Sequence, residues 1–314
     1  MFKRIGMIAG VLSCMAISAA GQNPQMYIDY PQLFTVILKK ADSMLQTGFK
    51  PLTAADLEQM AAKLTDEAPP AGTIRTAAPG ARLLRDEDIY ERRKNSVLVI
   101  GRIWRSADAS KNLHIDFLGT AFPISENGVC VTNYHVFKDI LGDKKNADHR
   151  DGMYCVTTLG GEIYFADRLL AYSQNNDLAV FGVATRGARL SPIPPGRPAQ
   201  VGAPVYCISH PQGFFYYFSK GMVASNVTVS SQQTAVGYNP QGKPPIRMEI
   251  TADYGIGSSG APILDQYGNL AGVVSSTVPV VANVQGENGV VFSQQQMIVK
   301  LTTPVKALRD LLGF

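Results

Sequence analysis

One serine of the chain stands in a setting that suits nucleophilic chemistry. Ser259 lies in the run Gly255-Ile256-Gly257-Ser258-Ser259-Gly260-Ala261-Pro262, between the apolar segments Ile246–Ile250 and Ala261–Leu264. A nucleophilic hydroxyl needs a tight turn that exposes it, and glycines on both sides allow such a turn. It also needs backbone N–H groups aimed at the oxygen that becomes charged in the transition state. We therefore predict that Ser259 is a nucleophile and that the N–H groups of Gly257 and Ser259 form an oxyanion hole.

A Gly/Ser-rich segment between strands is often only a loop, so this prediction depends on a base and an acid elsewhere in the chain. His135 ends the apolar segment that starts at Val131, and Asp177 begins another that runs to Phe181. Alone, the histidine could be a core residue and the aspartate a turn residue. Together they would supply Ser259 with a general base and with a carboxylate that orients the imidazole. We predict that His135, Asp177 and Ser259 form a catalytic triad.

The elements that must position these residues are short strands. From Ser96 onward, apolar segments alternate with turn residues. The expected strands are Val97–Trp104, Leu113–Phe117, Gly119–Ile124, Val129–Asn133, Tyr154–Leu159, Glu162–Ala171, Leu178–Val183, Val205–Ser209, Phe214–Ser219, Met222–Thr228, Arg247–Ile250, Ala261–Leu264 and Leu270–Ser276. So many strands with few helices predict an all-β fold of two six-stranded antiparallel β-barrels. Pro192–Pro198 is the expected crossing, so the site would lie in the cleft between the barrels.

These segments resemble those of the chymotrypsin-fold (trypsin-like) serine proteases, whose triad follows the order His, Asp, Ser. Within that group the HtrA/DegP-type branch is most similar, on the basis of Gly119-Thr120-Ala121-Phe122, Thr132-Asn133-Tyr134-His135-Val136, Asp177-Leu178-Ala179-Val180 and Lys220-Gly221-Met222-Val223-Ala224-Ser225. The similarity covers roughly Ser96 to Gly313. The resemblance implies an exported serine endopeptidase that acts through an acyl-enzyme; the alternative is a non-catalytic peptide-binding module on a protease fold. HtrA-type chains usually continue into a PDZ domain, which we do not expect here because the sequence stops at Phe314.

The resemblance also implies where substrate binds. A polypeptide substrate would pair as an added strand along Val274–Thr277, which makes Ser275, Ser276 and Thr277 substrate-binding residues. Asp253 lies six residues before Ser259, where trypsin has the aspartate that selects Lys or Arg. The HtrA pattern and the side chain of Thr277 favour a small apolar residue instead, and both specificities stay open. Ser258 stands where trypsin-type enzymes have Asp, so we expect activity without a newly cut N-terminal amine.

Upstream of the strands, the sequence indicates export and a helical extension. Lys3-Arg4 followed by the apolar Ile5–Ile17 predicts a signal peptide over residues 1–20, with lipoprotein anchoring at Cys14 as the alternative. Residues 21–88 hold two helical segments, Pro31–Leu45 and Thr53–Leu64, and a Pro/Ala/Gly linker. They could be a propeptide, an arm packed on the protease, a partner-binding segment or a spacer. Residues 89–314 are the predicted protease domain, with barrel one over about 96–190, barrel two over about 199–302 and a C-terminal helix over 303–313.

Composition narrows the remaining classes of partner. The net charge is +4 and no run of five or more basic residues occurs, so nucleic acid is not an expected partner. No segment is expected to span a membrane, and the predicted location is periplasmic or secreted. Neither a metal nor a cofactor is expected, since no ligand spacing typical of zinc occurs. A homo-oligomer stays open. Cys130, Cys155 and Cys207 are expected as buried thiols, with a Cys130–Cys155 bridge as the alternative.

Overall fold

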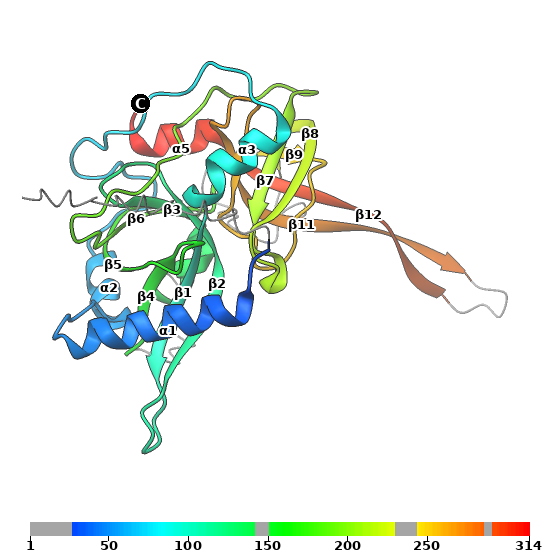
Figure 1. Ribbon diagram of the computed structural model, residues 1–314. Helices are drawn as coiled ribbons and strands as arrows, with labels where there is room; N and C mark the ends of the chain where they lie inside the picture. The colour runs from blue at the N-terminus through cyan, green and yellow to red at the C-terminus, as the bar shows by residue number, and fades with distance from the viewer. Residues whose placement is uncertain (1–26, 142–150, 230–243, 286–290) are drawn as a thin grey trace, which may run out of the picture.

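Two closed β-barrels form the body of the protein. The computed structural model describes residues 27–141, 151–229, 244–285 and 291–314; the predicted signal peptide and Cys14 lie outside these residues. The first barrel has the strand order β1-β2-β3-β6-β5-β4 and the second β10-β11-β12-β9-β8-β7, as Figure 1 shows. The prediction of an all-β fold with two six-stranded antiparallel barrels is confirmed.

The strands are bounded as follows. The first barrel contains β1 (Leu98–Arg105), β2 (Leu113–Pro123), β3 (Val129–Thr132), β4 (Met153–Thr157), β5 (Ile163–Ser173) and β6 (Leu178–Val183). The second contains β7 (Pro204–Ser209), β8 (Tyr217–Thr228), β9 (Ile246–Ile250), β10 (Pro262–Leu264), β11 (Leu270–Gln285) and β12 (Val291–Pro304). The Pro192–Pro198 segment lies between β6 and β7, where the crossing was expected.

Two predicted breaks in the strands were wrong. β2 is continuous because a register shift at Ile100/Gly101 lets it pass Leu118 as a bulge. β8 is continuous because Gly221 stays within the strand, where a Cβ would lie 2.2 Å from the Ala252 nitrogen. A glycine inside a strand pattern therefore marked a close approach of two backbones and not a turn.

β12 and the outer half of β11 were missed by the strand prediction. Beyond the barrel the two strands pair with each other from Thr277–Lys300 out to Gln285–Val291. Figure 1 shows this part as a two-stranded ribbon that projects away from the body. The side chains of Pro279–Val281 and of Ser293–Ile298 are exposed, so the alternation of apolar and polar residues that identifies a half-buried strand is absent there.

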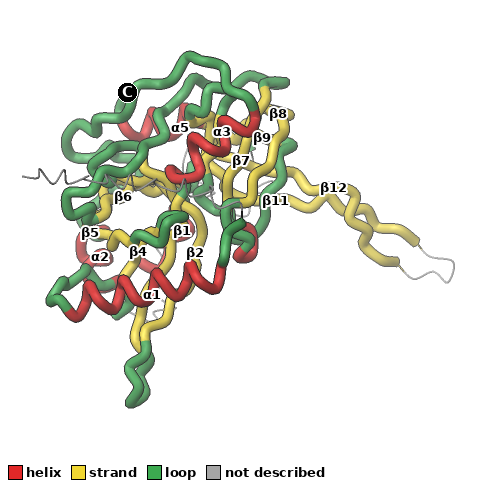
Figure 2. The backbone as a smooth tube through the Cα atoms, in the orientation of Figure 1, coloured by secondary structure: helices red, strands yellow, loops and turns green. Residues whose placement is uncertain are grey.

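Helices cover parts of both barrels, as the tube in Figure 2 shows. They are α1 (Tyr30–Gln46), α2 (Ala54–Ala61), α3 (Asp86–Arg93), the short α4 (Lys138–Leu141) and α5 (Val305–Leu312). α2 begins with the predicted capping box, in which Thr53 and Asp56 satisfy each other's backbone N–H groups. α5 ends at Gly313 with a φ of 82°, the left-handed conformation that glycine favours at a helix C-terminus.

The described part of the N-terminal extension packs on the first barrel. Leu33, Ile37 and Ala41 of α1 are buried in a cluster with residues of β1, β4 and β5. Leu57 of α2 is fully buried in the core cluster of the first barrel. Burial of this kind stabilises by roughly 1.5–3 kcal/mol for each large apolar side chain. Among the alternatives for this segment, the structure therefore shows an arm packed on the barrel.

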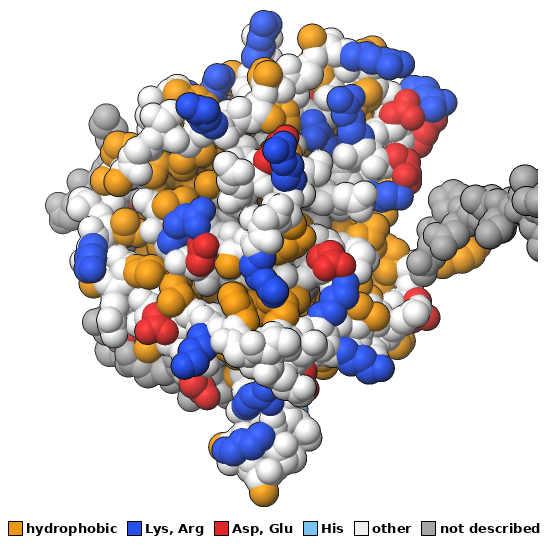
Figure 3. All heavy atoms as spheres, turned by 60° about the vertical axis from the view of Figure 1, so that its left-hand side comes forward, with side chains coloured by type: hydrophobic (Ala, Val, Ile, Leu, Met, Phe, Trp, Pro, Cys, Tyr) orange, Lys and Arg blue, Asp and Glu red, His pale blue; other side chains and the backbone are white. Residues whose placement is uncertain are grey.

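The cysteines, the helices and the surface charge bear on the kinds of partner and location that the sequence did not favour: a disulfide-linked pair, a membrane span and a nucleic acid. Cys130, Cys155 and Cys207 are buried free thiols, and β3 and β4, which carry the first two, are not neighbours in the barrel. Within the described residues, no helix is both long and apolar enough to cross a membrane. Figure 3 shows Lys and Arg scattered over one face among acidic and apolar side chains.

Candidate active site

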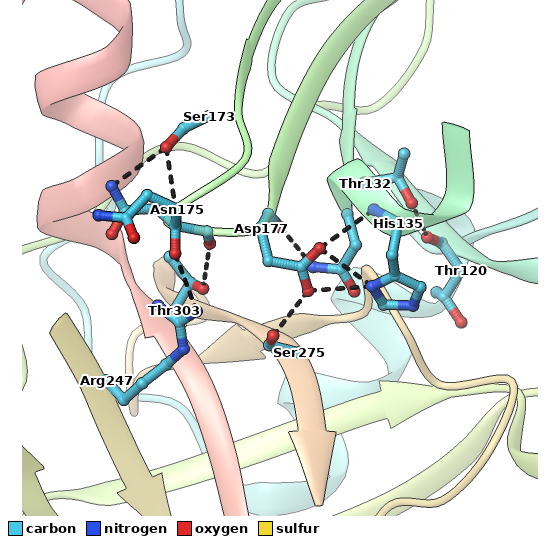
Figure 4. A network of polar contacts seen from close by, with 11 residues as sticks. Thr120, Thr132, His135, Ser173, Asn175, Asp177, Arg247, Ser275 and Thr303 are labelled. Carbon is cyan, nitrogen blue, oxygen red and sulfur yellow. Dashed lines mark hydrogen bonds and ion pairs between the residues drawn. The ribbon is translucent and has the colours of Figure 1, made fainter. Parts of the chain in front are cut away.

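A histidine and a buried aspartate meet in the first barrel. His135 lies on a short 3-10 helix, Tyr134–Phe137, that follows β3 directly, so it stands just past the strand that was expected to carry it. Its Nδ1 lies 3.0 Å from both carboxylate oxygens of Asp177, and its backbone N–H donates to Oδ1 at 3.1 Å. The ring is partly exposed while Asp177 is fully buried. This contact holds the Nδ1 edge of the imidazole ring (Figure 4). No hydrogen bond joins Nε2 to another described residue, so Nε2 can bind a different partner.

Asp177 is held by residues of both barrels. It precedes β6 with a φ of 52°, a left-handed conformation that aspartate tolerates better than most residues. The Asn133 side chain donates to its backbone oxygen at 2.8 Å. Ser275 of β11 donates its hydroxyl to Oδ2 at 2.6 Å. Figure 4 shows the carboxylate between His135 and Ser275. A residue of the second barrel, Ser275, thus fixes the side chain of Asp177 in the first barrel.

A buried guanidinium, that of Arg247, is attracted to this carboxylate. Arg247 of β9 is 1% exposed and donates to the backbone oxygen of Asn175 at 3.1 Å. Burial lowers the pKa of Arg247, while attraction to Asp177 opposes that shift.

The nucleophile loop is pressed against the first barrel. The Thr120 N–H donates to the Ser259 oxygen at 2.8 Å, and its hydroxyl donates to the Gly257 oxygen at 3.1 Å. A Cβ at Gly260, whose φ is +82°, would lie 2.2 Å from the Thr120 oxygen. A Cβ at Gly119 would lie 2.8 Å from the Ser259 oxygen and 3.5 Å from the side chain of Val136. The two glycines allow the backbone of Ser259 and the segment that carries His135 to meet at β2.

Three N–H groups of the loop have no acceptor among the described residues, those of Ile256, Gly257 and Ser259. The Ser258, Gly260 and Ala261 N–H groups donate to the oxygens of Gly255, Val274 and Ser258, respectively. Gly257 has a φ of +92°, and a Cβ there would lie 2.7 Å from the His210 oxygen. The three groups include the Gly257 and Ser259 pair that was predicted to form the oxyanion hole, and that role stays a prediction.

Ser258 fills a position where no charge is needed. It is fully buried, its hydroxyl donates to the Ser209 hydroxyl at 3.0 Å, and it accepts from the Gly255 N–H at 3.3 Å. These neutral hydrogen bonds hold the turn that precedes Ser259. The Ser259 hydroxyl itself makes no hydrogen bond to another described residue. Catalytic hydrogen bonds are often long before substrate binds, so the predicted pairing of Ser259 with His135 stays a prediction.

Asp253 does not line a buried pocket. Its side chain is 76% exposed and its carboxylate lies 3.4 Å from Lys300 Nζ. Lys300, on β12, also donates to the Tyr254 oxygen at 2.7 Å. The buried Tyr254 hydroxyl donates to the backbone oxygens of Ser276 and Leu301. Thr277 is exposed on β11. Among the described residues, Ser275 is the one predicted substrate-binding residue with a hydrogen bond to a predicted triad residue.

A groove between the barrels runs beside the nucleophile loop. It is lined by Phe117, Gly119, His210, Ile256 and Gly257, among others. His210 is 3% exposed, and its Nδ1 accepts from the Tyr216 N–H at 3.0 Å. Burial lowers the pKa of His210 to about 3, so this imidazole stays neutral.

Sequence reasoning missed the roles of Ser275 and Thr120. The run Val274-Ser275-Ser276 was recognised for its backbone, but no local pattern shows that Ser275 donates to an aspartate 98 residues earlier. Thr120 was part of the recognised segment, and a polar residue inside an apolar strand was its only signal. Among the described residues, no group of three or more His, Cys, Asp or Glu could hold a metal ion.

Comparison with known proteins follows this geometry. Residues 119–273 match the trypsin-like peptidase domain family. Protease Do-like 5 of Arabidopsis thaliana chloroplasts is 27% identical over 204 residues, which are 62% of this chain and 60% of that protein. Protease Do-like 1, also chloroplastic, is 30% identical over 159 residues, which are 49% of this chain and 32% of that protein. The chain therefore spans less than two thirds of the length of either relative.

Solved structures show the same fold at low identity. The HtrA-type protease AlgW, solved with a decapeptide, superposes with a TM-score of 0.50 at 18% identity over 73% of this chain and 66% of that one. Deg5 superposes with a TM-score of 0.50 at 23% identity over 72% of this chain and 93% of that one.

Proposed function

We propose that the chain is an exported endopeptidase of the HtrA and Deg type that acts through Ser259, His135 and Asp177. The match of residues 119–273 to the trypsin-like peptidase domain family and the 27% identity to Protease Do-like 5 support this proposal. The observation that carries this proposal is the buried Asp177 carboxylate 3.0 Å from His135 Nδ1. Asp177 accepts the Nδ1–H hydrogen bond, which leaves Nε2 unprotonated and facing outward as a base.

The reaction would proceed in two halves. His135 Nε2 removes the Ser259 proton as the hydroxyl oxygen attacks the peptide carbonyl carbon. The carbonyl oxygen becomes negatively charged and accepts hydrogen bonds from the free N–H groups of Gly257 and Ser259. His135 then gives its proton to the leaving amine, and the C–N bond breaks to leave an acyl-enzyme. Water repeats the sequence: its proton goes to His135, and the Ser259 oxygen leaves with that proton.

The environment of Asp253 supports a preference for small apolar residues before the cleaved bond. Selection of Arg or Lys needs a desolvated carboxylate, whereas this carboxylate is exposed and neutralised by Lys300. The buried ring of Tyr254 and the ammonium of Lys300 would both oppose a long cationic side chain. Export through residues 1–20 is part of the proposal, and the mature N-terminus tests it. Whether the chain forms a homo-oligomer stays open, and the mass in solution decides it.

The decisive test is chemical. A fluorophosphonate should label the wild-type protein at Ser259 and should not label Ser259→Ala. In a separate assay, Ser259→Ala should cleave casein at least 10⁴-fold more slowly than the wild type. Asp177→Asn is the matched control, because it keeps the side-chain shape but reverses the tautomer of His135. Labelling of neither wild type nor variant, with a folded protein, would instead identify a non-catalytic peptide-binding module.

A further inference from the structure

The free edge of β11 continues outward from the strand segment where substrate is expected to pair. β10 pairs with β11 only between Leu270 and Val273, and the N–H and C=O of Val274 bond to the nucleophile loop. From Ser276 outward, β11 pairs with β12 on one edge, and no described strand lies along the other. β11 is one continuous strand to Gln285.

The exposed ribbon lacks the charged side chains that usually protect a strand edge, although it has one proline, Pro279, and a register shift at Val280/Val281. β11 contains no charged residue, and β12 contains only Lys300, at the root of the ribbon. Natural edge strands commonly carry charged side chains because an open row of N–H and C=O groups recruits further strands. Here the exposed side chains include Val280, Val281, Met297 and Ile298. Pro279 has no backbone N–H, so it removes a single donor from the row.

We propose that Val278–Asn283 is an extended binding strand for the part of the substrate that lies N-terminal to the cleaved bond. The proposal rests on the proposed function, because the occupant is the same polypeptide that pairs with Ser275–Thr277. Six further residues at about 3.4 Å each add about 20 Å of strand. The occupant is an extended, uncharged segment rich in β-branched residues, since main-chain hydrogen bonds supply the affinity and apolar side chains flank the edge.

The occupant is a substrate and not a second copy of the chain because of continuity. A strand seated on Ser275–Thr277 runs directly onto Val278 without a turn, so its upstream residues have no other described strand to pair with. Such a strand lies in one register, set by the bond held at Ser259. This arrangement lets the enzyme select unfolded stretches long enough to reach along the ribbon.

Length dependence is the expected signature. Two quenched fluorescent peptides share one cleavage site and differ in having four or ten uncharged residues before it. The longer one should give a kcat/KM about tenfold higher, since several cross-strand pairs are added. A ribbon shortened by replacing Pro279–Ile298 with Asn-Gly should lose that gain and keep the rate on the short peptide, because Val278 and Val299 face each other.

N-methylated substrates test the same idea without altering the protein. In a β-pair only alternate N–H groups face the partner strand. Methylation at the fifth and seventh residues before the bond, or at the sixth and eighth, should therefore lower kcat/KM for one of these two peptides only. Equal effects of the two patterns would overturn the proposal, and so would a length gain that survives in the shortened ribbon.

Failure of catalysis can be separated from failure of the binding strand. Ser259→Ala should bind the long peptide more tightly than the short one in fluorescence anisotropy, and the shortened ribbon should remove that difference even if neither protein cleaves. If shortening converts an oligomer to a monomer while peptide affinity stays unchanged, the ribbon joins copies of the chain and the proposal is wrong.

Discussion

The pH dependence of stability should reveal the buried imidazole of His210. Burial lowers the pKa of this side chain to about 3 from an ordinary value of 6.5. The rings of Phe215 and Tyr216 lie against it, and neither brings a charge that would favour the imidazolium. The Leu98 backbone opposes this shift, and Nε2 has no hydrogen-bond partner among the described residues. The folded state therefore keeps His210 neutral.

The sign follows from which state binds the proton. Below pH 6.5 the unfolded chain takes up a proton that the folded chain refuses until about pH 3, so stability is complete above pH 6.5 and falls as the pH drops toward 3. At pH 5 the loss is about 2 kcal/mol relative to pH 8, from 1.36 kcal/mol per pKa unit over the interval below 6.5. Near pH 3 the loss of stability relative to pH 8 approaches about 5 kcal/mol.

Urea unfolding at several pH values measures this loss. Carboxylates also titrate in acid, so the comparison needs His210→Asn, whose Oδ1 can accept from the Tyr216 N–H in place of Nδ1. The free energy of unfolding of the wild type should fall about 2 kcal/mol further than that of the variant between pH 8 and pH 5. Parallel curves for the two proteins would refute the reasoning.

Three further predictions concern the site and its supports. Ser275→Ala removes a hydrogen bond to the Asp177 carboxylate, so kcat should fall roughly ten- to a hundredfold with KM unchanged, and the apparent pKa of the pH–rate profile should move; an unmoved profile would mean that the serine only fills space. Leu57→Ala should lower the free energy of unfolding by about 2–5 kcal/mol, against under about 0.5 kcal/mol for the exposed Leu83→Ala, and equal losses would show that the extension is not part of the fold. Asp253→Ser should change kcat/KM for cleavage after Val by less than about threefold; strong cleavage after Arg that disappears in this variant would make Asp253 the specificity determinant.

Local sequence carried much of the fold, because its signals are short-range. Alternating apolar residues and turn residues identified most strands of both barrels, and Thr53 with Asp56 identified the start of α2. Glycines were the ambiguous signal. Gly221 reads as a turn in sequence but lies within β8, because a close backbone contact requires it there. The ribbon escaped prediction because strands that face solvent on both sides carry no alternation.

The sequence by itself determined the order of His135, Asp177 and Ser259 and the glycines that a nucleophile turn requires. Tertiary structure alone decided what surrounds them: the Ser275 hydroxyl on Asp177, Thr120 on the nucleophile loop, and the exposure of Asp253 beside Lys300. The physical reason is the sequence separation of the residues that interact. A turn or a cap depends on residues a few positions apart, whereas the burial of a charge and its partners depend on which barrel faces which, and that is fixed only when both barrels pack.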